Sequence, residues 1–497
     1  IEIIDQHDNT VSDGSLPFIL VDEIRQADKA AVTPLTSSIV SQVEGHKVAL
    51  QLNMGDANPY YENGEFYIYY LQNSAYHSWY LSKTDDLLTG TFSEEIIPAS
   101  GDVNAQDRWI GSGSVMKDQS GQYHLFYTGH NKDHYPVEAV IHAVATDNTL
   151  KNWQTINQHT FTGSNGYSDY DFRDPFVFWN QDEQRYWMLI TSRYNNQAAI
   201  GLYTSTDLAS WTAQAPLYTE TSPLNLEVPE YFEFTDTPFI VYSDQRSESP
   251  VVKYLINQNN QWVKPSFDAL DGRYFYAARS AGPENERLLF GWVPHTDGRN
   301  DGASASWGGD LLVHQLHKHL SGELAVKMPD KVISQLNSAM AISPTWTQGN
   351  VQVQTNSATL QANSAFTLPA SNKVNRLQFN ISSASASAVT GIQFRMPVAG
   401  QADKLAYLKL DPTNGQAKFY FDGDEQNSTN PSIDINLDLQ SGVHVDLWLN
   451  PQSGVGAIYL NHYRALSFRL YDLAEYQIGL FSENNAATAS GLTRYSE

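Results

Sequence analysis

The sequence contains no cysteine, comparatively little charge and no long apolar run, and each of these features excludes certain kinds of site or partner. Without cysteine among its 497 residues, the chain has no disulfide, thiolate nucleophile or cysteine-ligated metal. Charged residues make up only 17% of the chain, and the formal net charge is -25 at pH 7. This charge argues against nucleic acid and anionic membrane as partners. No apolar run approaches the roughly 20 residues that cross a bilayer.

The amino-terminal segment also lacks the features of a signal peptide. From Ile1 onward it is polar and acidic, with neither a basic region nor an apolar core, so we expect no export signal within this chain. A start at Ile rather than Met indicates processing or trimming, and an export signal removed earlier is consistent with it.

Turn-forming and aromatic residues are plentiful instead. The chain has 31 Gly, 21 Pro and 12% aromatic residues, a mixture that favours many short strands over long amphipathic helices. Its length exceeds that of one ordinary domain, so two domains are expected.

A weak repeat with a period of about 60 residues runs through the first two thirds of the chain. Each copy has an acidic or polar turn, an aromatic strand and further strands, with copies near Asp56, Ser114 and Arg173. Two more copies are expected at 238–263 and 273–293. Repeated four-stranded sheets around an axis form a β-propeller, so residues 1–335 are predicted to be a five-bladed propeller.

The pattern changes after a predicted linker at residues 336–348. Segments such as 433–437 and 443–449 alternate apolar with polar residues, which is typical of strands with one face in a core and one in water. Residues 349–497 are therefore predicted to be a β-sandwich, and the whole chain to be all-β.

Three carboxylates occur in similar strand-edge settings, at Asp56, Asp174 and Glu227. An acid of this kind is more often a turn residue or half of a solvated ion pair, and Glu230 is a rival to Glu227. Three such acids in similar settings nevertheless indicate glycoside chemistry, which is performed by paired carboxyl groups.

These segments, in this order, resemble glycoside hydrolase family 32, which contains fructose-releasing invertases, inulinases and levanases. The matches are Arg173-Asp174-Pro175 to the family's Arg-Asp-Pro, Glu227-Val228-Pro229 to its Glu-Cys-Pro, and Gly55-Asp56-Ala57-Asn58-Pro59 to its Asn-Asp-Pro-Asn-Gly. The resemblance covers nearly the whole chain. It implies a propeller followed by a β-sandwich, as the pattern does.

The resemblance also implies roles for the matching residues. Asp56 is expected to be the nucleophile and Glu227 the acid/base, with their carboxyl groups about 5–5.5 Å apart, as retention requires. A raised pKa is expected for Glu227, since an acid must stay protonated near the working pH. Asp174 is expected to bind hydroxyls of the fructosyl unit, and Arg173 to orient the acids or the sugar. No metal or cofactor is expected.

Other substrate contacts are expected from five further residues: Asn58, Gln72, Trp79, Trp109 and Ser112. For the tryptophans, a place in the core is an equally good interpretation. His77, His130 and His295 have no metal-ligand spacing.

The departures from the family pattern point to a divergent member. Asn53 stands where the family usually has Trp, and Ala57 and Pro59 replace Pro and Gly, as in levan-active members that include levan fructotransferases. We therefore expect a retaining, extracellular β-fructosidase acting on levan, inulin or fructo-oligosaccharides. The alternatives are a fructotransferase forming a difructose anhydride, an inverting arabinoside-active propeller glycosidase with acids about 6.5–9.5 Å apart, and a non-catalytic carbohydrate-binding protein. The sequence does not indicate an oligomeric state.

Overall fold

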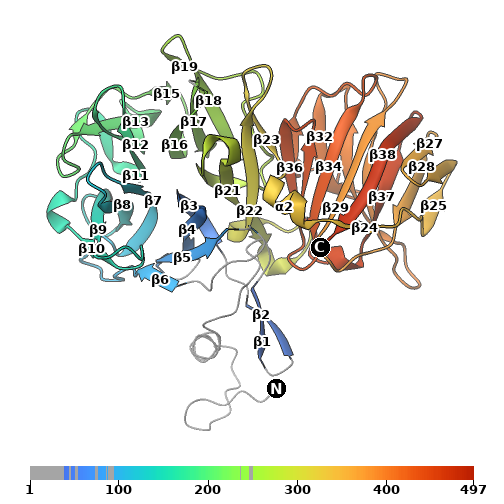
Figure 1. The fold of residues 1–497 in the computed structure, drawn as a ribbon, viewed down its shortest axis with the longest axis horizontal. Helices are drawn as coiled ribbons and strands as arrows, with labels where there is room; N and C mark the ends of the chain where they lie inside the picture. The colour runs from blue at the N-terminus through green and yellow to red at the C-terminus, as the bar shows by residue number, and fades with distance from the viewer. Residues whose placement is uncertain are drawn as a thin grey trace, which may run out of the picture.

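The computed structural model describes residues 39–43, 46–50, 54–72, 76–85, 87, 94–235, 237–245 and 250–497. Asn53 lies outside these residues. Regular structure in the described part is almost entirely β-strand, with one six-residue helix, α2 (Asp330–Gln335), so the prediction of an all-β fold is confirmed. No helix among these residues is long and apolar enough to span a membrane. Figure 1 shows two bodies side by side, β3 to β23 and β24 to β38.

Three sheets of the first body are built from consecutive antiparallel strands. Their strands, in order, are β7 (Trp109–Lys117), β8 (Tyr123–His130), β9 (Glu138–Ala145) and β10 (Trp153–Thr155); β11 (Tyr167–Asn180), β12 (Arg185–Tyr194), β13 (Gln197–Ser205), β14 (Thr212–Ala213) and β15 (Tyr218–Glu220); and β16 (Leu226–Phe234), β17 (Thr237–Asp244), β18 (Val251–Gln258) and β19 (Gln261–Val263).

A fourth sheet joins the beginning and the end of this body. It contains β3 (Met54–Glu62), β4 (Glu65–Gln72), β5 (Trp79–Thr84) and β6 (Glu94–Ile97), together with β20 (Tyr276–Ala281), β21 (Leu288–Thr296), β22 (Ala305–Lys318) and β23 (Leu324–Lys327). Among the described residues, strand pairing joins the two groups at one point, where Gly309 of β22 pairs with Met54 of β3. A separate hairpin is formed by β1 (Ile39–Val43) and β2 (His46–Leu50).

The first strand of each strand group lies on the inside of the body. β3 contacts β7, β7 contacts β11, β11 contacts β16, β16 contacts β20, and β20 returns to β3. Since strand pairing merges the first and last groups into one sheet, and no sheet in the described residues closes on itself, the five-blade count stays a prediction.

The sheets pack face to face, so most strands are buried on both sides. Separate apolar clusters lie between the β3–β6 and β7–β10 sheets, between the β7–β10 and β11–β15 sheets, and between the latter and the β16–β19 sheet. Such strands read as nearly continuous apolar runs, as β8 does, because neither face meets water.

Two further sheets form the second body around one shared core. One contains β26 (Val351–Gln354), β27 (Ser357–Leu360), β38 (Ala487–Ser496), β29 (Asn375–Ser382), β34 (Val443–Asn450), β35 (Val455–Leu460), β36 (Arg464–Arg469) and β24 (Ser338–Met340). The other contains β25 (Trp346–Gln348), β28 (Ser364–Leu368), β37 (Gln477–Ser482), β30 (Thr390–Met396), β31 (Lys404–Asp411), β32 (Gln416–Phe421) and β33 (Ser432–Asp434).

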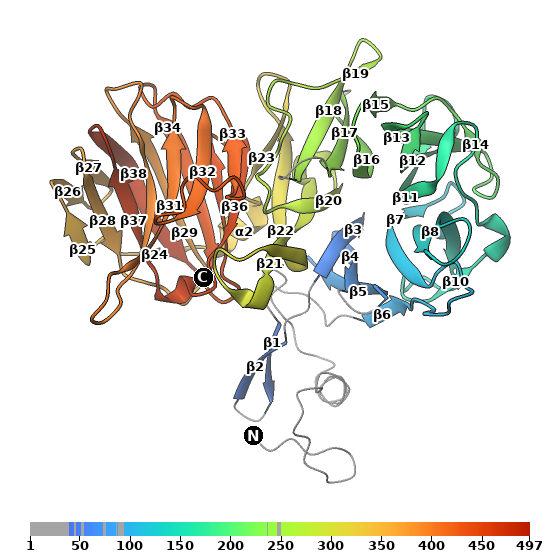
Figure 2. The ribbon, with the colours of Figure 1, turned by 180° about the vertical axis from the view of Figure 1, so that it is seen from behind.

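The predicted domain boundaries stay predictions, and the structure adds two details to them. Residues 336–348, predicted as a linker, contribute β24 to one sheet and β25 to the other. The two bodies also share a buried contact: Arg469 of β36 donates hydrogen bonds to the carbonyl oxygens of Val293 and Pro294 and forms an ion pair with Asp310 at 2.8 Å. Figure 2 shows this junction from behind, where β36 lies beside β23.

Candidate active site

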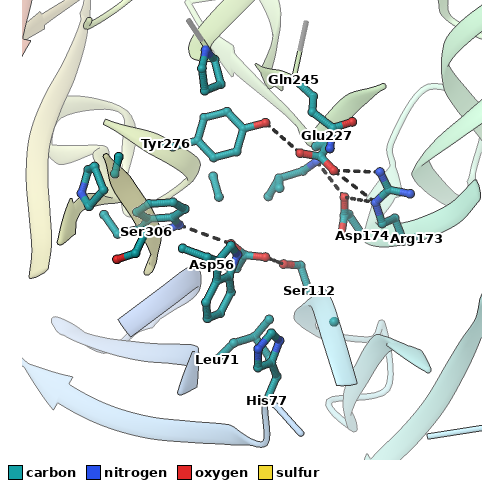
Figure 3. A pocket seen from close by; sticks show the side chains of 18 of the residues that line it. Asp56, Leu71, His77, Ser112, Arg173, Asp174, Glu227, Gln245, Tyr276 and Ser306 are labelled. Carbon is teal, nitrogen blue, oxygen red and sulfur yellow. Dashed lines mark hydrogen bonds and ion pairs between the residues drawn. The ribbon is translucent and has the colours of Figure 1, made fainter. Parts of the chain in front are cut away.

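A pocket of about 530 Å³ opens among the inner strands of the first body. Each of these strands contributes a lining residue: β3, β7, β11, β16 and β20 supply Asp56, Ser112, Asp174, Glu227 and Tyr276, respectively. Figure 3 shows these side chains pointing toward one another. The pocket therefore brings together the three acids that the sequence analysis singled out.

An irregularity in strand pairing recurs where each inner strand reaches the pocket. The register shifts lie at Gly55/Asn58, Gly111/Gly113, Arg173/Phe176, Glu227/Glu230 and Tyr276/Arg279. Left-handed backbone accompanies four of them, at Asp56 (φ 40°), Asp174 (φ 60°), Val228 (φ 51°) and Ala277 (φ 48°). A bulge re-aims the side chains beside it, and such backbone costs about 1–2 kcal/mol per residue. The site is thus built from strained positions.

Asp56 is held by two donors on the floor of the pocket. Its Oδ2 accepts a hydrogen bond of 2.7 Å from the Ser112 hydroxyl, and its Oδ1 accepts one of 3.3 Å from the Trp292 indole N–H. Burial raises the pKa of Asp56 to about 7; the hydrogen bond from Ser112 opposes this rise, and the charges of Asp174 and Glu227 add to it.

Glu227 is fixed by partners on both of its oxygens. The Arg173 guanidinium donates to Oε1 at 2.7 Å from Nη2 and 3.3 Å from Nε, and the Tyr276 hydroxyl donates to Oε2 at 2.7 Å. Arg173 also forms ion pairs with Glu138 at 3.2 Å and Asp171 at 3.3 Å. The guanidinium therefore orients Glu227 while it is itself held by two further carboxylates.

Asp174 is almost fully buried, and its contacts link β11 to β8, β12 and β16. Its Oδ2 accepts hydrogen bonds from the Thr191 hydroxyl at 2.9 Å and the Val228 N–H at 3.1 Å, and its own N–H donates to the Thr128 hydroxyl at 2.9 Å. Burial raises the pKa of Asp174, although the charge of Arg173 opposes this rise. Asp56 and Asp174 therefore share a raised carboxyl pKa, with burial as the main cause.

Glu230, the rival of Glu227, lies elsewhere. It is completely buried, and its Oε2 accepts a hydrogen bond of 2.7 Å from the Ser280 N–H. It is absent from the pocket lining, which includes Glu227. The bulge between these two residues turns only Glu227 toward the cavity.

The other predicted contact residues divide into two groups. Ser112 lines the pocket, and the buried Asn58 supports it from behind, donating to the Asp56 carbonyl oxygen at 2.6 Å and accepting from the Gly113 N–H at 3.2 Å. Three residues are outside the pocket lining: Gln72, which ends β4; Trp79, which is fully buried and donates to the Gly111 carbonyl oxygen at 2.9 Å; and Trp109, which packs against Arg108 and Tyr76.

Several pocket residues were not predicted. Tyr276 and Trp292 donate to the two acids, and Trp307 stacks on His77 with ring centroids 4.4 Å apart. Trp307 also explains Gly55, since a Cβ at that position would lie 2.3 Å from the indole ring. The signal that could have found Tyr276 is its place at the start of the fifth repeat copy, which corresponds to the positions of the acids.

The described residues contain no group of three or more His, Cys, Asp or Glu side chains arranged to hold a metal ion. The side chains that line the pocket supply carboxylates, the guanidinium groups of Arg173 and Arg273, hydroxyls, the His77 imidazole and indoles.

A nearly all-β chain with three carboxylates in one pocket defines a candidate glycosidase, and comparison with known proteins specifies the family. The family model described as "Glycosyl hydrolases family 32 N-terminal domain" matches residues 46–323. The chain belongs to this family, and the resemblance inferred from the motifs is confirmed.

Relatives and solved structures agree with this placement. Fructan 1-exohydrolase w1 of Triticum aestivum is 23% identical over 292 residues, and fructan 6-exohydrolase of Beta vulgaris is 23% identical over 282 residues; these matches cover 51% and 49% of this chain. The chain spans about half the length of these curated relatives, 48% and 46%. The crystal structure of fructan 1-exohydrolase IIa from Cichorium intybus is similar in fold, with a TM-score of 0.70 at 15% identity, covering 93% of this chain and 97% of that one.

Proposed function

We propose that this protein hydrolyses β-fructosides, namely fructans such as levan or inulin and their oligosaccharides. The observation that carries the proposal is the convergence of Asp56, Asp174 and Glu227 in one pocket of a family 32 chain. The names of its relatives, fructan 1-exohydrolase and fructan 6-exohydrolase, support fructan as the substrate class.

The proposed reaction proceeds in two steps with retention. The Asp56 carboxylate attacks the anomeric carbon while Glu227 gives its proton to the leaving oxygen, and a covalent fructosyl-enzyme forms. Glu227 then takes a proton from water, the water oxygen bonds to the anomeric carbon, and Asp56 is released. The hydrogen bonds that Ser112 and Trp292 donate to Asp56 suit an anionic nucleophile that becomes the leaving group of the second step.

Arg173 and Asp174 are proposed to position and stabilise rather than to bond. Asp174, with one oxygen held by Thr191 and Val228, offers its remaining lone pairs to sugar hydroxyls. These hydrogen bonds strengthen as positive charge develops on the ring. Arg173 and Tyr276 fix the orientation of the Glu227 carboxyl. A fixed orientation is needed for a carboxyl that must give its proton to one particular atom, the leaving oxygen.

Hydrolysis is proposed ahead of transfer to a second sugar. The transferase alternative rests on the replacements at Asn53, Ala57 and Pro59, of which Asn53 lies outside the described residues. Ala57 is buried in the core, Pro59 pairs with Ile68 inside the sheet, and neither lines the pocket. Ala57 and Pro59 are therefore not placed to contact an acceptor sugar in the pocket.

The finer architecture belongs to the proposal as well. We take the five strand groups, four of four strands and one of five, as blades of a propeller over residues 1–335, and residues 349–497 as a separate β-sandwich after a linker at 336–348. The recurrence of one bulge on each inner strand supports five equivalent units. An extracellular location is proposed from the substrate class.

Incubation with sucrose, inulin, levan and an arabinan, followed by product analysis, tests the activity. We expect fructose from at least one fructan, and Asp56→Asn and Glu227→Gln should each lower kcat by several orders of magnitude. The matched control is Asp182→Asn, an exposed acid in the turn between β11 and β12. Release of arabinose alone, or normal activity of the Glu227→Gln variant, contradicts the proposal.

A further inference from the structure

A second cavity lies on the sandwich, away from the residues that line the active-site pocket. It measures about 440 Å³ and is lined by residues of β28, β37, β30, β31 and β32 and the loops that follow them. Strand register places Gln393 opposite Tyr407, and Tyr407 opposite Tyr420. These side chains stand on the face of the sheet opposite the shared core, which takes the alternate residues, for example Leu408 and Phe419. Both ribbon views place β28 and β25 at the end of the molecule far from β8 to β10 (Figures 1 and 2).

Polar side chains line this cavity without a hydrogen-bond partner in the described part of the chain. Gln393 is 4% exposed and Tyr420 is 7% exposed, and both line the cavity. Neither side chain, nor the hydroxyl of Tyr407, has a hydrogen-bond partner among the described residues. Their polar atoms are not among the fully buried, unpaired side-chain atoms of the described residues, so they are open to the cavity and free to bond a ligand. An amide and two hydroxyls turned into one cavity therefore indicate a polar ligand.

Aromatic rings form a wall beside these groups. Tyr407 and Tyr420 stack with ring centroids 5.4 Å apart, and the Tyr407 ring meets Phe481 edge-on at 5.3 Å. Tyrosine combines a large apolar face with a polar tip. The cavity thus suits a ligand that has both C–H surfaces and hydroxyl groups.

Acidic side chains at the rim determine the charge of that ligand. Asp422, Glu425 and Glu483 line the cavity, and Lys409 on β31 forms ion pairs with Glu425 at 2.7 Å and Glu483 at 3.4 Å. A second ammonium, that of Lys418, donates to the Glu425 carbonyl oxygen. Three carboxylates against two ammonium groups still leave the rim net negative, which repels anions. Carboxylates accept hydrogen bonds from hydroxyl groups, so a neutral polyhydroxylated molecule fits.

Tyr407 serves as a donor in this setting. Burial, followed by the charges of Asp422 and Glu483, raises its pKa to about 12, so the hydroxyl stays protonated over the working range of pH.

From these observations we infer that the sandwich carries a second carbohydrate-binding site, which takes a fructosyl unit of a fructan chain through Gln393, Tyr407 and Tyr420. The choice of fructose rests on the proposed function, while the choice of a neutral sugar rests on the cavity itself. Two sites on one chain raise the local concentration of a polymer at the catalytic pocket, as linked binding modules do. Short substrates cannot bridge two sites, so the second site should act on polymers alone.

Binding to polymer is measured on the full chain carrying Glu227→Gln, which keeps the substrate intact. Affinity electrophoresis in gels containing levan, inulin or dextran gives the apparent Kd. Two substitutions remove polar groups with little change in shape: Gln393→Met and Tyr407→Phe. Gln352→Met, at an exposed glutamine of β26 in the other sheet, is the matched control.

We expect Gln393→Met and Tyr407→Phe together to weaken fructan binding at least fivefold, while Gln352→Met leaves it unchanged. In chains with Glu227 intact, the same pair should raise KM for the polymer and leave the rate on a fructose-containing trisaccharide unchanged. Because the replaced groups have no partner, Tm should not fall. An unchanged Kd, or equal retardation by dextran and fructan, overturns the inference.

Failure of this inference and failure of the proposed function give different results. If the wild-type chain releases fructose but the variants bind polymer normally, the second site is wrong and the hydrolase stands. If no fructose is released from any substrate while the variants lose fructan binding, the second site stands and the hydrolase is wrong.

Discussion

Replacing the buried Asp56 by asparagine tests the electrostatics of the pocket through the stability of the protein. Burial raises the pKa of this carboxyl to about 7 in the folded chain, whereas the ordinary value is about 3.9. Because the folded state binds this proton more tightly than the unfolded state, the stability from this group is fully present at low pH. It is lost as the pH rises from about 4 to about 7. Asparagine has no proton to lose and escapes this destabilisation.

The size of the effect follows from the two pKa values. A difference of about 3 in pKa, at 1.36 kcal/mol each, corresponds to roughly 4 kcal/mol, of which about 2 kcal/mol falls between pH 5.5 and 8.5. We therefore expect the stability of Asp56→Asn relative to wild type to increase by about 2 kcal/mol between these two pH values. The variant keeps the shape of the side chain and an oxygen that accepts from the Ser112 hydroxyl, but its amide nitrogen replaces the oxygen that accepts from the Trp292 N–H. This loss does not depend on pH, so it leaves the expected difference between the two pH values unchanged.

Urea denaturation followed by tryptophan fluorescence at pH 5.5, 7.0 and 8.5 measures this difference. Asp182→Asn, at an exposed turn, should keep the pH dependence of the wild type. Stability curves of Asp56→Asn and wild type that run parallel over this range would refute the reasoning, because they would show that Asp56 titrates alike in both states.

Three further outcomes are expected. Since nucleophilic attack requires the ionised carboxylate, kcat/KM should fall as the pH drops below about 7. Ser112→Ala should move this fall to higher pH, because it removes a hydrogen bond that lowers the Asp56 pKa. A pH profile that does not move contradicts the assignment of Asp56. Arg279→Met should lower the free energy of unfolding by about 3–5 kcal/mol, because this buried guanidinium donates to three carbonyl oxygens of β7 and β11; an unchanged urea midpoint would disprove that role. Trp448→Ala, at a residue only 3% exposed, should cost about 3–5 kcal/mol without altering kcat, and a changed product profile at constant Tm would instead place the sandwich at the substrate.

The sequence predicted the acids of the pocket better than their partners. Asp56, Asp174 and Glu227 were recognisable because a charged residue at the start of an aromatic strand has no reason to be in a core. Trp292 was not, because its partner Asp56 is 236 positions away in the chain and an indole on an apolar strand reads as core. The contact between them depends on how the first and last strand groups meet, which no local pattern records.

Trp79 illustrates how the role of a strand residue depends on packing. Strands buried on both faces do not alternate, so the sequence cannot tell which face of β5 points toward the cavity. In the structure the Trp79 ring packs between neighbouring sheets, and its N–H donates a hydrogen bond to the Gly111 carbonyl oxygen. The half-buried Trp109 packs on Arg108. The choice between core and contact was therefore left open by the sequence and depended on packing.

The repeated bulge explains how a repetitive chain forms a site with distinct chemical roles. Each inner strand turns aside at the same level, and the residues placed there differ: an acid, a hydroxyl, a second acid, and then Glu227 and Tyr276 beside the last two bulges. Backbone strain and buried carboxyl groups make this level of the fold expensive in free energy. The cost is offset where the strands continue as regular, apolar ladders, so the same strands can be rigid along their length and chemically specific at their ends. A substitution that removes a bulge should therefore raise stability and abolish activity together.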